Sequence, residues 1–259
     1  MAAMNPSSLI VQGRRARIWR GGQGPALFLL HAGGGEARTC WNRVWESLAD
    51  DFQVIAPDWP GFGESEPMPR TTYDDLTRWV DELRLALTLE RFAIVGNSFG
   101  ATTARFYGAA YPEHTTRLTM INGGGYLHPA SGRLPTGASL TPKPGMTPEE
   151  FFREMLKLMF HNQSLLTPET IAEQSAGSLT IFSILGQATM GPAPSAVTPR
   201  APTLVLRGEG DRYVPPWNGA QVAAELPNAE FRLVANAGHM PQIERPEAIV
   251  AAIGEFLRC

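Results

Sequence analysis

Cysteine is scarce in this sequence of 259 residues, which contains only Cys40 and Cys259. Two cysteines are too few for a disulfide framework, and neither stands at the spacing of a metal-ligand pair. The sequence also lacks the G-x-G-x-x-G pattern and the lysine of a phosphate-binding loop. We therefore expect neither a bound metal nor a cofactor.

An excess of charge of one sign is also absent. The 22 lysine and arginine residues against 25 aspartate and glutamate residues give a formal net charge of −3, so no basic field draws nucleic acid or an anionic membrane. The longest strongly apolar run, residues 25–30, is too short to cross a bilayer. Residues 1–20 contain no apolar core of signal-peptide length. We expect a cytoplasmic monomer or homodimer that binds a small-molecule substrate, not nucleic acid or membranes.

Short apolar runs do occur, and they alternate with helical patterns along most of the chain. Such runs suit strands buried on both faces of a parallel sheet. Residues 72–89 have apolar side chains at helical spacing, and Thr72 with Asp75 matches a capping box. The alternation predicts an α/β fold with a mostly parallel, doubly wound sheet. The main candidate strands are residues 26–30, 53–56, 92–95, 118–121, 204–206 and 231–234.

The pattern changes between residues 123 and 200, which are rich in proline, glycine, serine and threonine. Two helices are expected inside this segment, because Thr147 and Thr167 are each followed by proline, as at many helix starts. We therefore predict that residues 1–122 and 201–259 form the core domain. Residues 123–200 are expected to form an inserted, mostly helical cap.

The segment 96–100, Gly-Asn-Ser-Phe-Gly, matches G-x-S-x-G between a candidate strand and a candidate helix. In that context the motif makes a tight turn that raises a serine hydroxyl above the edge of the sheet. We predict that Ser98 is a nucleophile. The alternative is a glycine-rich turn without chemistry.

A serine hydroxyl is a weak nucleophile until a base removes its proton. His239 follows a candidate strand near the end of the sequence, whereas His31 precedes the serine. Asp211 is the only aspartate after Ser98, and the order Ser, Asp, His is found in one common class of hydrolase. We therefore predict His239 as the base and Asp211 as the acid that orients it, with Glu209 as the rival acid.

Catalysis of acyl transfer also needs N–H donors for the developing oxyanion. The Phe99 amide is expected to be one, because it follows the nucleophile directly. The turn at residues 31–35, His-Ala-Gly-Gly-Gly, follows another candidate strand, and its glycines allow a backbone N–H to approach a substrate closely. Gly33 is the predicted second donor, although this segment also suits a plain flexible turn.

With these residues in place, the chain resembles the α/β-hydrolase superfamily over nearly its whole length. Within it, the glycine run 33–35 followed by Trp41 and Asn42, Asn97 before the nucleophile and the cap segment 149–168 look most like hydrolases that cleave carbon–carbon bonds of aromatic ring-fission products. Two positions differ from that group, because Met240 stands where a tryptophan is usual and no arginine lies near residues 173–174. The motifs behind the resemblance to the superfamily are residues 31–34, 58–65, 96–100, 208–211 with 214–215, and 238–239.

The resemblance implies substrate contacts by Gly34, Asn42, Asn97 and Met240. The cap carries many apolar side chains, Phe182 among them, and we expect part of this surface to form an apolar pocket above Ser98.

We therefore predict a cofactor-independent serine hydrolase that cleaves a small acyl substrate, most simply a carboxylic ester. A carbon–carbon bond hydrolase of ring-fission products is the alternative within the resemblance. A cofactor-free haloperoxidase or perhydrolase, an acyltransferase and a slow-turnover ligand receptor also stay open, because each could use the same residues.

Overall fold

One eight-stranded sheet forms the centre of the computed structural model, which describes residues 2–123, 125, 144–176 and 197–258. The strand order is β1-β2-β4-β3-β5-β6-β7-β8. The pairs β1–β2 and β2–β4 are antiparallel, and the remaining pairs are parallel, which confirms the predicted mostly parallel sheet. The strands are β1 (Asn5–Val11), β2 (Arg14–Gly21), β3 (Ala26–Leu30), β4 (Gln53–Pro57), β5 (Phe92–Asn97), β6 (Thr115–Ile121), β7 (Thr203–Gly208) and β8 (Ala229–Val234).

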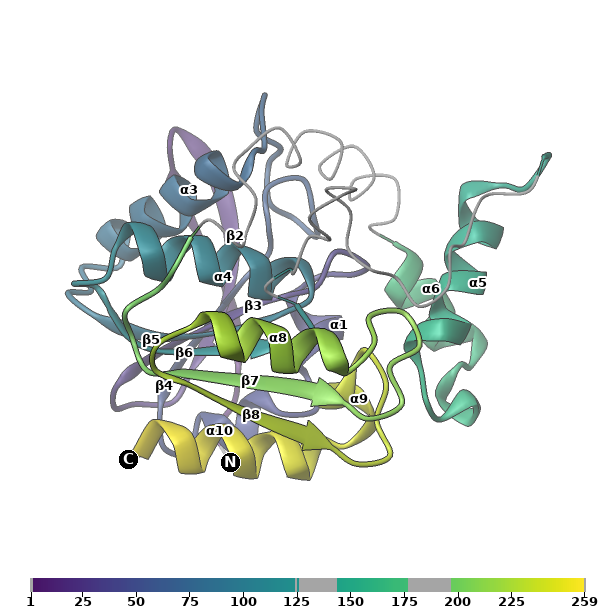
Figure 1. Ribbon diagram of the computed structural model, residues 1–259. Helices are drawn as coiled ribbons and strands as arrows, with labels where there is room; N and C mark the ends of the chain where they lie inside the picture. Colours follow the sequence, from purple (N-terminus) through teal and green to yellow (C-terminus); the bar gives the residue numbers. More distant parts are fainter. Residues whose placement is uncertain (1, 124, 126–143, 177–196, 259) are drawn as a thin grey trace.

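Helices cover both faces of this sheet (Figure 1). On one face, α1, α2 and α10 contribute to a buried cluster with Leu27 and Leu29 of β3. On the other face, α3, α4 and α8 pack with Phe28 and Leu30 of the same strand. Successive strand side chains point to opposite faces, so a strand buried on both sides must be apolar throughout, as β3 is. The helices are α1 (Ala37–Trp41), α2 (Trp45–Leu48), α3 (Tyr73–Ala86), α4 (Phe99–Ala110), α5 (Pro148–Met159), the 3₁₀ turn η1 (Gln163–Leu165), α6 (Pro168–Ser175), α8 (Trp217–Glu225), α9 (Pro241–Glu244) and α10 (Pro246–Arg258).

The predicted helix starts are present. Thr72 accepts a hydrogen bond from the Asp75 N–H, and the Asp75 carboxylate accepts from the Thr72 N–H, which completes the capping box of α3. Thr147 makes the same capping box with Glu150 at the start of α5, whereas Thr167 caps α6 by accepting a hydrogen bond from the Thr170 N–H; proline is the first helical residue of each helix. These caps satisfy N–H groups that have no partner inside the helix.

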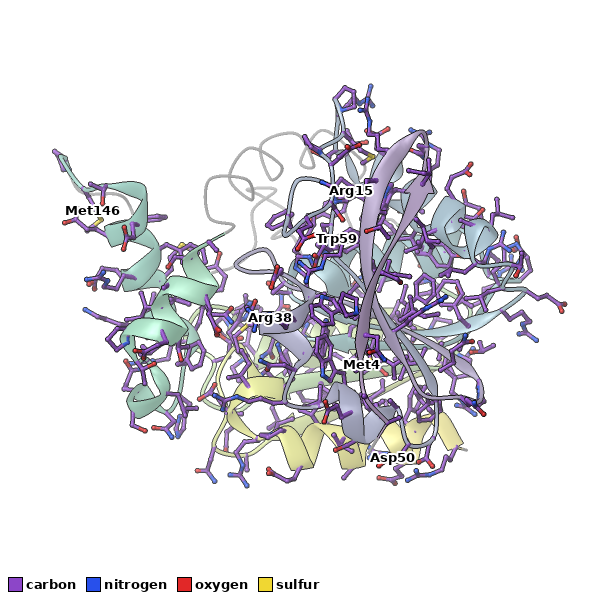
Figure 2. All side chains as sticks on the ribbon, turned by 180° about the vertical axis from the view of Figure 1, so that it is seen from behind. Met4, Arg15, Arg38, Asp50, Trp59 and Met146 are labelled. Carbon is purple, nitrogen blue, oxygen red and sulfur yellow. The ribbon has the colours of Figure 1, made fainter. Side chains whose placement is uncertain are left out.

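Helices α5 and α6 lie between β6 and β7 in the chain and stand to one side of the sheet (Figure 1). Figure 2 shows Met146, just before α5, at the outer edge of the molecule, whereas Arg38 of α1 lies between the sheet and these two helices. The arrowheads of β7 and β8 point to the side of the molecule on which α5 and α6 lie (Figure 1). None of the described helices is long and apolar enough to cross a membrane.

Candidate active site

Ser98 occupies a strained turn between β5 and α4. Its φ of 52° lies in the left-handed region, which is rare for a residue with a side chain. Both flanking glycines are required by packing. A Cβ atom on Gly96 would overlap the Gly100 carbonyl, and one on Gly100 would overlap the Leu30 carbonyl. The G-x-S-x-G spacing therefore has a direct steric reason in this fold.

Three of the predicted site residues meet at the carboxyl edge of the sheet. The imidazole of His239 lies with Nε2 2.8 Å from Ser98 Oγ and with Nδ1 2.7 Å from Asp211 Oδ2. The other carboxylate oxygen of Asp211 accepts hydrogen bonds from the N–H groups of Tyr213 and Val214, each at 2.8 Å. Because the carboxylate accepts at Nδ1, that nitrogen carries the proton and Nε2 is left as the acceptor facing the serine.

The sheet order explains how residues so distant in sequence come together. Asp211 follows β7 and His239 follows β8, and these strands lie in the same parallel series as β5, the strand that precedes Ser98. Burial strengthens their interaction, since the side chains of His239 and Asp211 are 1% and 0% exposed.

Two buried asparagines hold the loop that carries His239. Asn97 donates to the His239 carbonyl at 3.2 Å and to the Ile121 carbonyl at 3.1 Å. Asn122 donates to the Gly238 carbonyl at 2.7 Å and accepts from the Gly208 N–H at 3.0 Å. The structure thus places Asn97, a predicted substrate contact, fully buried among protein groups. Sequence reasoning missed Asn122, whose one signal is its position directly after β6.

The two predicted oxyanion donors lie next to the serine turn. Phe99 is the first residue of α4, and Ser98 is its N-cap. Gly33 follows β3, and the pairing of Leu30 with Gly96 places that loop beside the turn. Their role stays a prediction.

His31, at the start of the same loop, is fully buried and has a structural role. Its Nδ1 donates to the Ala32 carbonyl at 2.6 Å, and its Nε2 accepts from the Trp59 N–H at 3.0 Å. Burial lowers the pKa of His31 to about 3, so the ring is neutral near pH 7. With both nitrogens engaged, His31 links the glycine loop to the loop after β4.

The remaining predicted substrate contacts are spread around this centre. Gly34 lies under the inserted helices, since a Cβ there would meet the Gln174 carbonyl at 2.8 Å and the Phe152 ring at 2.9 Å. Met240 is buried in the cluster that also contains Phe152 of α5. Asn42 is exposed at the end of α1. Their contacts with a substrate stay predictions, as does that of Phe182, which lies outside the described residues.

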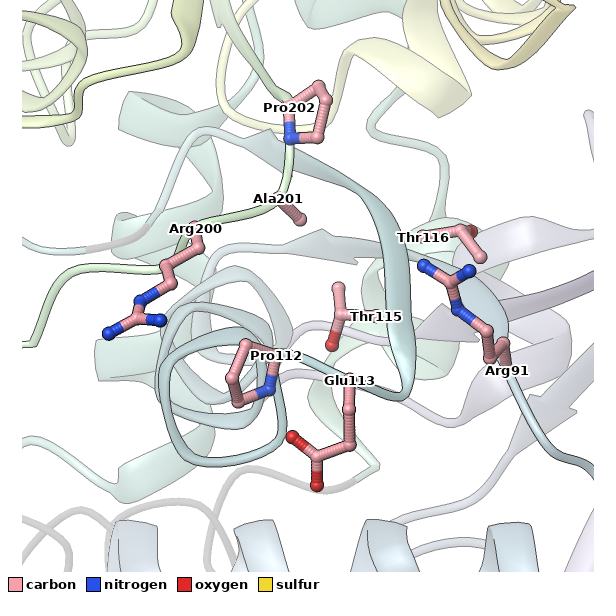
Figure 3. Close-up of a pocket in the computed structure, with 8 residues that line it drawn as sticks. All are labelled: Arg91, Pro112, Glu113, Thr115, Thr116, Arg200, Ala201 and Pro202. Atoms are coloured by element: carbon pink, nitrogen blue, oxygen red, sulfur yellow. The ribbon is translucent and has the colours of Figure 1, made fainter.

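A pocket of about 460 Å³ lies at the opposite, amino-terminal edge of the sheet (Figure 3). It does not include the serine turn. Its lining residues are Arg91, Pro112, Glu113, Thr115, Thr116, Arg200, Ala201 and Pro202. Among the described residues, no group of three or more histidine, cysteine, aspartate or glutamate side chains could hold a metal ion.

Comparison with known proteins identifies the class. The chain matches the alpha/beta hydrolase family over residues 27–252, so it belongs to that family and is a hydrolase. A 2-hydroxy-6-oxo-6-phenylhexa-2,4-dienoate hydrolase of Burkholderia cepacia is 30% identical over 255 residues, which cover 91% of this chain and 88% of that protein.

Solved structures agree on the fold. A membrane phospholipase A, a bacterial virulence factor, superposes with a TM-score of 0.85 at 25% identity and covers 98% of this chain and 86% of its own. A meta-cleavage product hydrolase from Pseudomonas fluorescens IP01 superposes with a TM-score of 0.83 at 22% identity, covering 97% of each chain. The second likeness supports the architecture alone.

Proposed function

We propose that this hydrolase is a cofactor-independent serine esterase with Ser98, His239 and Asp211 as its catalytic triad. The observation that carries the proposal is the pair of hydrogen bonds on the two sides of the His239 ring, at 2.8 Å to Ser98 and at 2.7 Å to Asp211. A neutral imidazole held in this way can take the serine proton while the carboxylate stabilises the resulting imidazolium.

The proposed reaction has two halves. Ser98 Oγ attacks the ester carbonyl as its proton moves to His239 Nε2, and the amides of Phe99 and Gly33 stabilise the oxyanion. His239 then gives the proton to the departing alcohol. Water attacks the acyl-serine by the reverse route, with His239 as the base again, and releases the carboxylic acid.

Residues 123–200 are proposed to cap this site and to bind the substrate's apolar part. The support for the position of the cap is that Phe152, Met155 and Met159 of α5, with Phe160 just after it, lie in the same buried cluster as Met240. A cap that excludes water strengthens the electrostatic interactions inside the site.

The described residues of the cap also support the proposal that the substrate is uncharged. Gln174 of α6 is buried, and its amide donates to the Thr39 carbonyl at 3.3 Å, next to the glycine loop. The described cations of α5, Arg153 and Lys157, are half exposed and pair with glutamates of their own helix. A substrate carboxylate buried without a cation partner is costly, so these residues favour an uncharged ester.

A second candidate is carbon–carbon bond hydrolysis of a ring-fission product. The 30% identity with a dienoate hydrolase favours it, whereas the phospholipase likeness favours an ester. The two candidates share the triad and differ in the substrate.

The test is kcat/KM for a neutral p-nitrophenyl butyrate beside that for a carboxylate-bearing dienone, at equal enzyme concentration. The ester reading predicts at least about a tenfold higher kcat/KM for the neutral substrate, or ~1.4 kcal/mol. A clear preference for the dienone would contradict the esterase proposal and favour carbon–carbon bond hydrolysis.

A further inference from the structure

Glu244, the last residue of α9, uses its two carboxylate oxygens on two different parts of the chain. Oε1 accepts a hydrogen bond from the Gly238 N–H at 2.7 Å. Oε2 accepts from the Asn162 N–H at 2.8 Å, just after α5. The Glu244 side chain thus links the loop that carries His239 to the segment just after helix α5 through two hydrogen bonds.

A direct backbone contact runs beside this bridge. The His239 N–H donates to the Met159 carbonyl, the last carbonyl of α5, at 2.5 Å. The approach is close enough that a Cβ atom on Gly238 would overlap the same carbonyl. The end of α5 therefore rests on the backbone of His239, and glycine is needed for it to do so.

The loop of His239 is consequently held from two sides. Its carbonyls accept from Asn97 and Asn122 of the core, and its N–H groups donate to Glu244 and Met159. The core contacts belong to the sheet edge. Of the N–H contacts, the one to Met159 depends directly on where α5 lies, and the one to Glu244 is linked to the end of α5 through the second carboxylate oxygen of Glu244.

We propose that Glu244 is a positioning residue that ties the end of α5 to the His239 loop, so that the placement of α5 sets the placement of the imidazole. The proposal rests on the proposed function, because it takes His239 as the base. A carboxylate suits the task since it offers two acceptors. A glutamine would turn its NH₂ group toward one of the two N–H donors and lose that bond.

The test compares Glu244→Gln with the control Glu247→Gln, which makes the same chemical change at an exposed residue of α10. We expect kcat for a neutral ester to fall by about 10- to 100-fold in Glu244→Gln, because small misplacement of a catalytic group has effects of that size. KM should change little, and the control should match the wild type.

Amide hydrogen exchange measured by mass spectrometry distinguishes the loss of this specific link between α5 and the His239 loop from a general loss of stability. Exchange should accelerate in residues 236–240 and 159–163 together, while the peptide that contains β5 and α4 keeps its protection. If Glu244→Gln folds poorly, Glu244→Asp, which keeps both oxygens on a shorter stem, should show the same paired acceleration. Unchanged exchange in either segment, or kcat within about twofold of the wild type, would overturn the proposal.

The exchange readout does not need a known substrate. If the wild type hydrolyses no neutral ester, the esterase proposal fails, while the paired exchange of the two segments still decides whether Glu244 ties them.

Discussion

Replacing Asp211 by asparagine would show how far activity depends on one carboxylate oxygen. In the structure, Oδ1 accepts from the N–H groups of Tyr213 and Val214, and Oδ2 accepts from His239 Nδ1. An asparagine keeps its oxygen on the two backbone donors and presents its NH₂ group to the imidazole. Nδ1 must then act as the acceptor, which moves the ring proton to Nε2 and removes the lone pair that Ser98 needs.

The size of the effect follows from this change of tautomer. The same substitution in serine proteases lowers kcat by about 10⁴-fold, or roughly 5 kcal/mol of transition-state stabilisation. Here the Asp211 carboxylate is fully buried and lies 2.7 Å from His239 Nδ1, and His239 Nε2 lies 2.8 Å from Ser98 Oγ. We therefore expect a loss of about 10³- to 10⁴-fold in kcat with a nearly unchanged fold, since the backbone donors keep their acceptor.

The assay is steady-state hydrolysis of p-nitrophenyl butyrate, with circular dichroism to verify folding. Glu209→Gln is the matched control, because Glu209 is the nearby exposed carboxylate and the rival acid. Its kcat should stay within about threefold of the wild type. If Glu209→Gln were the more damaging change, or if Asp211→Asn kept more than about a tenth of the activity, the assignment of Asp211 would be refuted.

Two further predictions concern the surroundings of the site. Burial raises the pKa of Asp58 from 3.8 to about 6, which contributes stability that is present below about pH 4 and lost as pH rises through about 6. Between about pH 4 and pH 7 the free energy of unfolding of the wild type should therefore fall by up to about 3 kcal/mol more than that of Asp58→Asn. Urea denaturation at both pH values measures this difference, and the same pH dependence in both proteins would contradict the prediction. Gly34→Ala should lower kcat/KM and destabilise the fold by about 1–3 kcal/mol, because the new Cβ meets the Gln174 carbonyl at 2.8 Å. If kcat/KM and the free energy of unfolding both kept their wild-type values, α6 would not pack against this loop.

The parts of the fold that could be predicted are those that leave a local pattern. A strand such as β3 is apolar on every residue because both its faces are buried. Ser98 stands in a contiguous motif, and Asp211 and His239 follow strands in a known order. The structure brings these three side chains together as that order predicted, and their chemical roles are what the experiments test.

The missed contacts depend on residues far apart in the chain. Asn122 bonds to Gly238 across 116 positions, and Glu244 bonds to Asn162 across 82. Neither contact leaves a periodicity or spacing in the sequence, since each arises only once the strands lie side by side. For the same reason, sequence reasoning could not show that the Asn97 side chain donates its hydrogen bonds to backbone carbonyls.

The most direct test of the account is mass spectrometry of the chain after reaction with a fluorophosphonate probe, which captures activated serines. The account predicts one adduct, on the peptide that contains Ser98, and none in Ser98→Ala. Labelling of Asp211→Asn should be slower, because His239 would be less able to take the serine proton. An adduct that persists in Ser98→Ala, or a wild-type chain that is not labelled at all, would contradict the claim that Ser98 is the nucleophile.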